Sequence, residues 1–538
     1  MVTLCTNRRA QSSNFGRCHI SLHHPFIMTF ANKLHFGRVS SYMIIGPFLI
    51  FSIHCVLIHA YTSTNNGAAV DEMRVPNSPK SVAIIGAGAA GLATARVFAR
   101  ATEGTDCVIR VFEKHEKKDN RDRGSSNGKD DERIFGIGGV WHYEGSPPMS
   151  SNQKKNKPMY KYLRTNLPRE IMGFRERPWG NVKRNDWRVV DSLMPSFGDP
   201  DDYSYPTHEE VHSYLSDYAR HFNLTQKISF GCEIKNLQIV NRDDEWSPIR
   251  LEWSCTENES CSHEEGVFDI VCVANGHYAK PAPLTIISKD DQSPAFKGTI
   301  MHAVEYDDPQ AFEGKVVLCV GARASGSDLA REISQYASAV YLSDSTLDPL
   351  LGDDIPRSHG NVTVMPRTDV VTDEYIKFNG FSKESIVKGI DTIILCNGYD
   401  YDFPFINDGS MLGDDWSCVT GERRVAPLYE QLWHARYPSL AFVGLPHSVL
   451  PFPLFELQAE AIAAQFGLLP TLDNRMKAAI KDANGGGPNV PGRVQDTHFL
   501  GGFQWDYCRK MSCLAGNYDD RMEGYLSLNK VSKEHNDL

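Results

Sequence analysis

A glycine-rich turn that follows an apolar run and leads into a helical pattern occurs twice in this chain. The first copy follows residues 81–85 and the second follows residues 315–320. An apolar strand that breaks on glycine and enters a helix begins a βαβ unit, whose helix N-terminus can bind the pyrophosphate of a dinucleotide. The repeated turn therefore predicts an α/β chain with two Rossmann-like dinucleotide-binding domains.

The first turn carries a complete dinucleotide-binding pattern. Gly86 permits the tight bend, Gly88 lets a pyrophosphate approach the backbone, and Gly91 allows the helix to pack closely on the strand. Glu113 ends the next apolar run, where a carboxylate can accept the ribose hydroxyls of an adenosine. The pattern favours FAD or NAD, and the residues predicted to contact it are Gly86, Gly88, Ala89, Ala90, Gly91 and Glu113.

The second turn departs from this pattern at its middle position, which is Arg323. A guanidinium can bind a phosphate, whereas Asp344, at the end of the following strand, would favour the free 2′-hydroxyl of NADH. Arg323 favours a phosphate and Asp344 favours a free hydroxyl, so the residues alone do not distinguish NADPH from NADH. The predicted contacts of this second dinucleotide are Gly321, Arg323, Ser325, Gly326, Ser327 and Asp344.

Composition narrows the class of protein. A chain of 538 residues can hold several domains, and a net charge of -11 argues against a nucleic-acid binder. The 13 cysteines include no CxxC pair, which argues against a zinc ribbon or a dithiol reductase, and no metal site is expected. Cys255 and Cys261 flank a polar loop, where they either pair or remain free thiols.

The N-terminus has the pattern of a targeting segment. Residues 42–60 are apolar and uncharged, and they follow a basic segment at 1–38. Residues 39–60 are expected to form a hydrophobic helix, either a signal anchor or a cleaved signal peptide. This places the chain at a membrane or in the secretory pathway, with the endoplasmic reticulum favoured, and residues 61–78 are expected to be a linker.

Further motifs carry a resemblance to a known family. Residues 296–306 read FxGxxxHxxxY, with His302 and Tyr306 as the last two fixed positions. Together with Gly138–Trp141, the Thr165–Asn166 segment and residues 451–458, this motif resembles the flavin-containing monooxygenases. The related Baeyer–Villiger enzymes usually end the motif in Trp. His302 is interpreted either as a structural histidine at a domain hinge or as a proton-transfer group.

The resemblance implies a discontinuous FAD domain at 79–300 and 401–538, with an inserted NAD(P)H domain at 301–400. It also implies that NADPH reduces FAD, which takes up O2 and forms a C4a-hydroperoxide that oxygenates an amine or a sulfide. Asn166 is the predicted catalytic residue. The further cofactor contacts that it implies are Gly139, Val140, Trp141, Thr165, Asn166, Asn275, Asn397, Glu456 and Gln458.

Several alternatives remain at this point. A Baeyer–Villiger-type ketone monooxygenase, an NAD(P)H oxidase and a redox-sensing flavoprotein without catalytic activity would share the same two turns. The chain could act alone or as a homodimer. Asn275-Gly276 and Asn397-Gly398 each end a buried-strand pattern, and both are expected where the chain crosses between the two dinucleotide-binding domains.

Overall fold

The chain divides into two units, Met1–Ala69 and Val70–Leu538. A computed structural model describes parts of the second unit: residues 79–117, 134–143, 145, 158–179, 205–257, 260–283, 295–347, 357–379, 386–406, 419–420, 423–485 and 497–516. The apolar run at 42–60, predicted to be a signal anchor or signal peptide, lies outside these residues. Among the described helices, none has the length and apolar character that a bilayer span requires.

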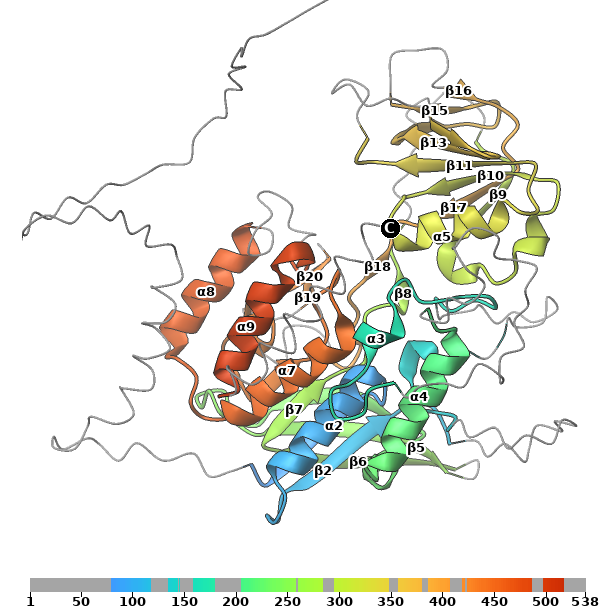
Figure 1. The fold of residues 1–538 in the computed structure, drawn as a ribbon. Coiled ribbons are helices and arrows are strands. Elements are labelled where there is room, and N and C mark those ends of the chain that lie inside the picture. The colour runs from blue at the N-terminus through green and yellow to red at the C-terminus, as the bar shows by residue number, and fades with distance from the viewer. Residues whose placement is uncertain are drawn as a thin grey trace, which may run out of the picture. The chain divides into compact units, whose positions relative to one another are not determined.

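The first sheet has seven strands and is built from distant parts of the chain (Figure 1). Its central strands are parallel, and β1 pairs with both β2 and β7. In spatial order the strands are β21 (Leu428–Tyr429), β22 (Trp433–His434), β23 (Leu440–Phe442), β7 (Ile270–Val273), β1 (Ser81–Ile85), β2 (Val108–Glu113) and β3 (Ile228–Phe230). Because β23 joins β7 only after the second sheet has been completed in sequence, this α/β domain is discontinuous.

Both faces of the first sheet are buried, which explains why β1 is apolar from Val82 to Ile85. Val82 and Ile84 pack against helices, whereas Ala83 and Ile85 pack against a three-stranded sheet on the other face. These helices are α2 (Ala89–Ala101), α3 (Arg169–Met172), α4 (His208–His221), α7 (Pro451–Ala464) and α9 (Gln504–Leu514). A further helix, α8 (Leu472–Gly485), contacts β21. The three strands are β4 (Cys232–Ile239), β5 (Ile249–Glu257) and β6 (Ser260–Phe268).

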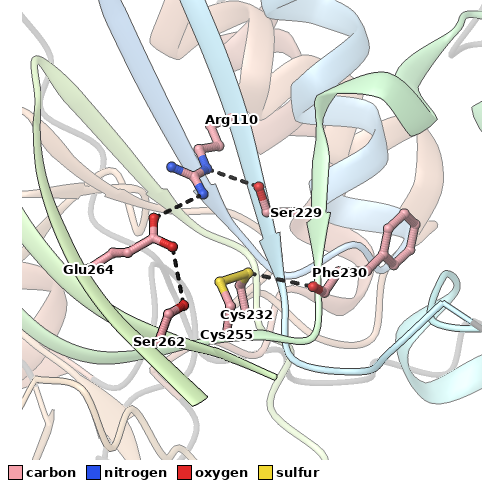
Figure 2. The surroundings of a disulfide bond; sticks show 7 residues. All are labelled: Arg110, Ser229, Phe230, Cys232, Cys255, Ser262 and Glu264. Atoms are coloured by element: carbon pink, nitrogen blue, oxygen red, sulfur yellow. Dashed lines mark hydrogen bonds and ion pairs between the residues drawn. A yellow bond between two sulfur atoms is a disulfide. The ribbon is translucent and has the colours of Figure 1, made fainter. Parts of the chain in front are cut away.

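A disulfide joins Cys232 and Cys255 across β4 and β5 (Figure 2). The two residues are directly opposite each other in the antiparallel register, so their side chains lie on the same face. Cys261 lies opposite Thr256 on β6. A pairing of Cys255 with Cys261, one of the two sequence-based expectations, is therefore wrong, because the sulfur of Cys255 is already bonded to Cys232.

The second sheet lies wholly within residues 299–395 and has six strands (Figure 1). Their order is β12 (Arg357–His359), β13 (Val362–Pro366), β11 (Ala339–Asp344), β10 (Val316–Val320), β17 (Thr392–Leu395) and β9 (Thr299–His302). Val317 and Cys319 pack towards α5 (Ala324–Ile333), and Leu318 packs towards a small sheet on the other face. That small sheet contains β14 (Thr368–Val371), β15 (Ile376–Phe378) and β16 (Ile386–Val387).

The two crossings between the sheets pair with each other. Lys280–Pro281 forms β8 and Tyr399–Asp400 forms β18, and the two are antiparallel. Each follows one of the Asn-Gly pairs, and Figure 1 shows both between the two sheets. The short remaining elements are η2 (Gly139–Trp141), η4 (Leu224–Lys227), η5 (Ala303–Glu305), η6 (Pro309–Phe312), β19 (Val419–Thr420), β20 (Arg424–Val425) and η10 (Gly501–Phe503).

Candidate active site

The first turn can be made only with glycine at Gly86 and Gly91. Gly86 has a φ of +105°, and a Cβ there would lie 2.7 Å from the Ala274 carbonyl oxygen. A Cβ on Gly91 would lie 1.8 Å from the carbonyl oxygen of Gly86. Helix α2 therefore starts in direct contact with the end of β1, and its free N–H groups face the turn.

The backbones of Gly88 and Gly139 form the two sides of a cradle. A Cβ on Gly139 would lie 3.2 Å from the Gly88 Cα, and one on Gly88 would lie 3.6 Å from the Gly139 Cα. The Gly138 N–H donates to the Ala87 carbonyl over 3.0 Å and ties this segment to the turn. Val140 and Trp141 follow in η2 and are half-buried. A cradle without side chains beside a helix N-terminus fits the pyrophosphate of FAD.

Glu113 lies beside the first turn at the end of β2. Its Oε2 accepts the Ala87 N–H over 2.9 Å, and its Oε1 accepts the N–H of His115 over 2.9 Å. The His115 Nδ1 is 2.6 Å from the same Oε1. Burial alone would raise the pKa of Glu113, but these hydrogen bonds and the charge of His115 outweigh it and lower the pKa. The carboxylate therefore stays ionised, and its Oε2 retains a lone pair for a ribose hydroxyl.

The second turn repeats the backbone of the first. Gly321 has a φ of +107°, and a Cβ there would lie 2.6 Å from the Cys396 carbonyl oxygen. A Cβ on Gly326 would lie 1.7 Å from the carbonyl oxygen of Gly321. Arg323 precedes α5 with φ -73° and ψ -176°, and Gly88 precedes α2 with φ -75° and ψ -175°. Because that backbone is extended, an arginine occupies it without strain.

The side chains of the second turn are held differently from those of the first. The Oδ1 of Asp344 accepts the N–H and the hydroxyl of Thr346 over 2.8 and 2.7 Å. The Ser327 hydroxyl donates to the Ala322 carbonyl, and Ser325 is exposed. Asp344 thus bonds to the loop that follows its strand, whereas Glu113 bonds to the turn itself.

His302 links the start of the second sheet to a crossing. Its Nε2 lies 3.0 Å from the Gly398 carbonyl oxygen, and its Nδ1 accepts the Val304 N–H over 3.1 Å. We assign the Nε2–H tautomer from these partners. Burial lowers the pKa of His302, in spite of the bond to Gly398. These contacts agree with the hinge interpretation, because both ring nitrogens are occupied by backbone groups.

The two crossing asparagines also bond to backbone. Asn275 Nδ2 donates to the Asp402 carbonyl over 3.2 Å, and Asn397 Nδ2 donates to the Pro283 carbonyl over 3.1 Å. In this arrangement each amide fastens one crossing to the other. Their predicted role as cofactor contacts stays a prediction.

The other predicted contacts lie on the first domain. Thr165 is buried and donates its hydroxyl to the Leu167 carbonyl, whereas Asn166 is exposed. On α7, Glu456 accepts the Arg175 N–H over 2.9 Å. Gln458 accepts the Gly444 N–H and donates to the Tyr507 hydroxyl, each over 2.9 Å. Within the described residues these bonds fasten α7 to its surroundings, and the role of Asn166 stays a prediction.

A group of rings lies near the crossings, with Tyr401 and His498 buried and His277 half-buried. His277 and His498 each lie within 5.3 Å of Tyr401, measured between ring centres. Burial and the neighbouring His447 lower the pKa of His277 to about 4 and that of His498 to about 3. Both rings are therefore neutral at neutral pH. The sequence gives no signal for this group, because its members come from separate loops.

Comparisons with known proteins agree with this geometry. Residues 130–348 match the family described as flavin-binding monooxygenase-like. Two relatives from Arabidopsis thaliana are each 32% identical to this chain. The match to flavin-containing monooxygenase FMO GS-OX-like 2 covers 75% of this chain and 77% of the relative. The match to flavin-containing monooxygenase FMO GS-OX3 covers 80% of this chain and 83% of the relative.

Solved structures are similar over most of the chain. S-allyl-L-cysteine S-oxygenase from Allium sativum is 28% identical with a TM-score of 0.63, and the match covers 85% of this chain and 94% of that one. Tmm from Pelagibacter sp. strain HTCC7211 is 21% identical with a TM-score of 0.58, and the match covers 82% of this chain and 90% of that one. The second likeness concerns the fold alone.

Proposed function

We propose a substrate for this chain on the basis of its family, since the chain belongs to the flavin-containing monooxygenases. The proposed physiological substrate is a thioether, which the enzyme converts to a sulfoxide. The chain is an FAD- and NADPH-dependent monooxygenase that oxidises sulfur or nitrogen nucleophiles. The observation that favours sulfur is the likeness to S-allyl-L-cysteine S-oxygenase, which extends over 94% of that protein.

Residues of the chain have separable roles in this reaction. Bound FAD supplies the chemistry that accepts electrons from NADPH and activates O2. The cradle of Gly88 and Gly139 would hold the FAD pyrophosphate, and Glu113 would hold its ribose. The second turn, at Gly321 and Gly326, would hold NADPH.

Oxygenation of a thioether sulfur requires little proton transfer from protein side chains to that sulfur. A thioether sulfur has a lone pair at every ordinary pH and needs no general base before it attacks an electrophilic oxygen. The protein must instead keep water away from the reacting groups. The neutral rings of His277, Tyr401 and His498, of which Tyr401 and His498 are buried and His277 is half-buried, are suited to that task, since they add no charge that would draw water inwards.

The test uses the full-length, FAD-loaded protein with NADPH and O2. Three substrates are compared: S-allyl-L-cysteine, N,N-dimethylaniline and cyclohexanone. We expect one sulfoxide for each NADPH oxidised, with a higher kcat/KM than for the amine. Lactone as the main product would establish the Baeyer–Villiger alternative. Peroxide equal to NADPH consumed with every substrate would establish an oxidase, and a flavin that NADPH does not bleach would point to a sensor.

We also propose that the protein enters the secretory pathway. Two observations support this: the apolar run at 42–60 and the Cys232–Cys255 disulfide, a bond typical of oxidising compartments. Thiol labelling of freshly prepared protein under denaturing conditions should leave Cys232 and Cys255 unmodified until a reductant is added. Labelling of both without reductant would contradict the proposal. N-terminal sequencing distinguishes an anchor from a cleaved signal peptide, and sedimentation distinguishes a monomer from a homodimer.

A further inference from the structure

Phe499 lies under the guanidinium of Arg323, although the two residues come from different domains. The Arg323 Cζ is 5.6 Å from the centre of the Phe499 ring, a distance at which the ring face attracts a cation. Arg323 precedes α5 at the position that Gly88 occupies before α2. The Phe499 ring therefore contacts Arg323, whose counterpart in the first turn, Gly88, has no side chain.

The position of Phe499 is set by the backbone around it. His447 and Phe499 form a parallel β-bridge, with hydrogen bonds from the His447 N–H to His498 and from the Leu500 N–H to His447. Gly501 has a φ of +52°, and a Cβ there would lie 3.0 Å from the Phe499 ring. The ring is thus held by the loop before α7 and by Gly501, and both belong to the first domain.

A ring fixed in this way can hold a flexible cation in place. An arginine side chain has about 2 kcal/mol of rotamer entropy, and a side chain that is already ordered loses less of it when a ligand binds. The α5 N-terminus and the glycine turn, to which Arg323 itself belongs, also favour an anion. A guanidinium kept there adds charge-assisted hydrogen bonds to phosphate oxygens.

We propose that Phe499 is a positioning residue that holds the Arg323 guanidinium over the second turn, where it binds the pyrophosphate of NADPH. The proposal uses the NADPH dependence of the proposed function and nothing of its substrate. It also assigns a role to the C-terminal segment around residue 499, which lies far from both glycine turns in sequence.

The test measures binding of NADP+ to the full-length, FAD-loaded protein by calorimetry, with no substrate present. Phe499→Leu should raise the Kd about two- to fivefold, the factor expected for a cation–π contact of this kind. Phe499→Tyr should restore the Kd, because it keeps the ring face. Phe503→Leu is the matched control, since Phe503 is 41% exposed and lies in the same segment, and it should leave the Kd unchanged.

A double-mutant cycle separates positioning from a general structural effect. In an Arg323→Ala background, Phe499→Leu should cause no further loss of affinity. Equal losses in both backgrounds, an unchanged Kd, or the same loss with Phe503→Leu would each overturn the proposal. If Phe499→Leu does not retain FAD, Phe499→Met replaces it in the cycle. If the Kd values follow the expected pattern but no sulfoxide is formed, only the thioether assignment is overturned.

Discussion

The hydroxyl of Tyr306 donates a hydrogen bond of 2.7 Å to the Oε2 of Glu332. Tyr306 is the last residue of the FxGxxxHxxxY motif, and Glu332 lies on α5, with both side chains buried. Burial raises the pKa of Glu332 to about 7, although the bond from Tyr306 acts in the opposite direction. The pair connects the motif to the helix that starts at the second turn.

This pair should make stability depend on pH. Between the ordinary carboxyl value of 4.5 and about 7, native Glu332 holds a proton that the unfolded chain has lost. The native state then binds more protons, so the free energy of unfolding falls as pH rises through this range. We expect wild-type protein to lose up to about 3 kcal/mol relative to Glu332→Gln between pH 5 and 8. Urea midpoints of both proteins measure this, and parallel pH curves would refute it.

The two turns are predicted to bind different cofactors, so a substitution in each should affect one cofactor alone. Gly91→Ala places a methyl group against the Gly86 carbonyl, and Gly326→Ala does the same against Gly321. We expect Gly91→Ala to lose FAD, and Gly326→Ala to keep FAD but bind NADP+ at least tenfold more weakly. Absorbance at the flavin band and NADP+ calorimetry measure the two effects. Gly502→Ala, whose Cβ meets nothing within 4 Å, is the control and should match wild type.

His302→Phe tests the hinge. The substitution leaves the buried N–H of Val304 without its acceptor, the Nδ1 of His302, which costs about 1–3 kcal/mol. It also removes the ring donor to the Gly398 carbonyl, which still accepts the N–H of Ala282. We expect a lower melting temperature and slower bleaching of the flavin by NADPH, with an unchanged shape of the pH–rate profile. His263→Phe, at an exposed position on β6, is the control. Disappearance of one limb of the profile would instead assign proton transfer to His302.

The disulfide should stabilise the first domain. It closes a loop with a sequence separation of 23, for which chain entropy gives roughly 3 kcal/mol. Replacing both Cys232 and Cys255 by Ser should lower the melting temperature and leave the flavin spectrum unchanged. Dithiothreitol should lower the melting temperature of wild type but not of the double variant. Equal sensitivity of the two proteins to reductant would show that another bond is responsible.

The local parts of the site could be predicted from sequence. Gly86, Gly91 and Glu113 belong to one βαβ unit, where strand, turn and helix follow one another, so their spacing is sufficient to place them in the fold. Their contacts with a cofactor stay predictions. The same holds for the placement of Gly321 and Gly326 where β10 leads into α5. The strand order of the first sheet agrees with the discontinuous domain that the family resemblance implies, and the predicted domain boundaries stay predictions.

Long-range contacts could not be predicted in this way. Whether Cys255 bonds Cys232 or Cys261 depends on which residues stand opposite each other in the sheet, and either strand could supply the partner. The contact of Arg323 with Phe499 depends on how the C-terminal segment returns to the second turn. The sequence predicts that Asp344 ends a strand, and β11 does end there. The bond of Asp344 to Thr346 depends on the conformation of the following loop.

The strand order of the first sheet also has a consequence for synthesis on the ribosome. The second sheet is complete in sequence at Leu395, whereas the first sheet lacks β21, β22 and β23 until Phe442 has been added. Domains generally fold as units during synthesis. The inserted domain, although it is encoded in the middle, is thus the first that can finish folding. Until β23 has been translated, the edge of β7 that pairs with it stays unpaired.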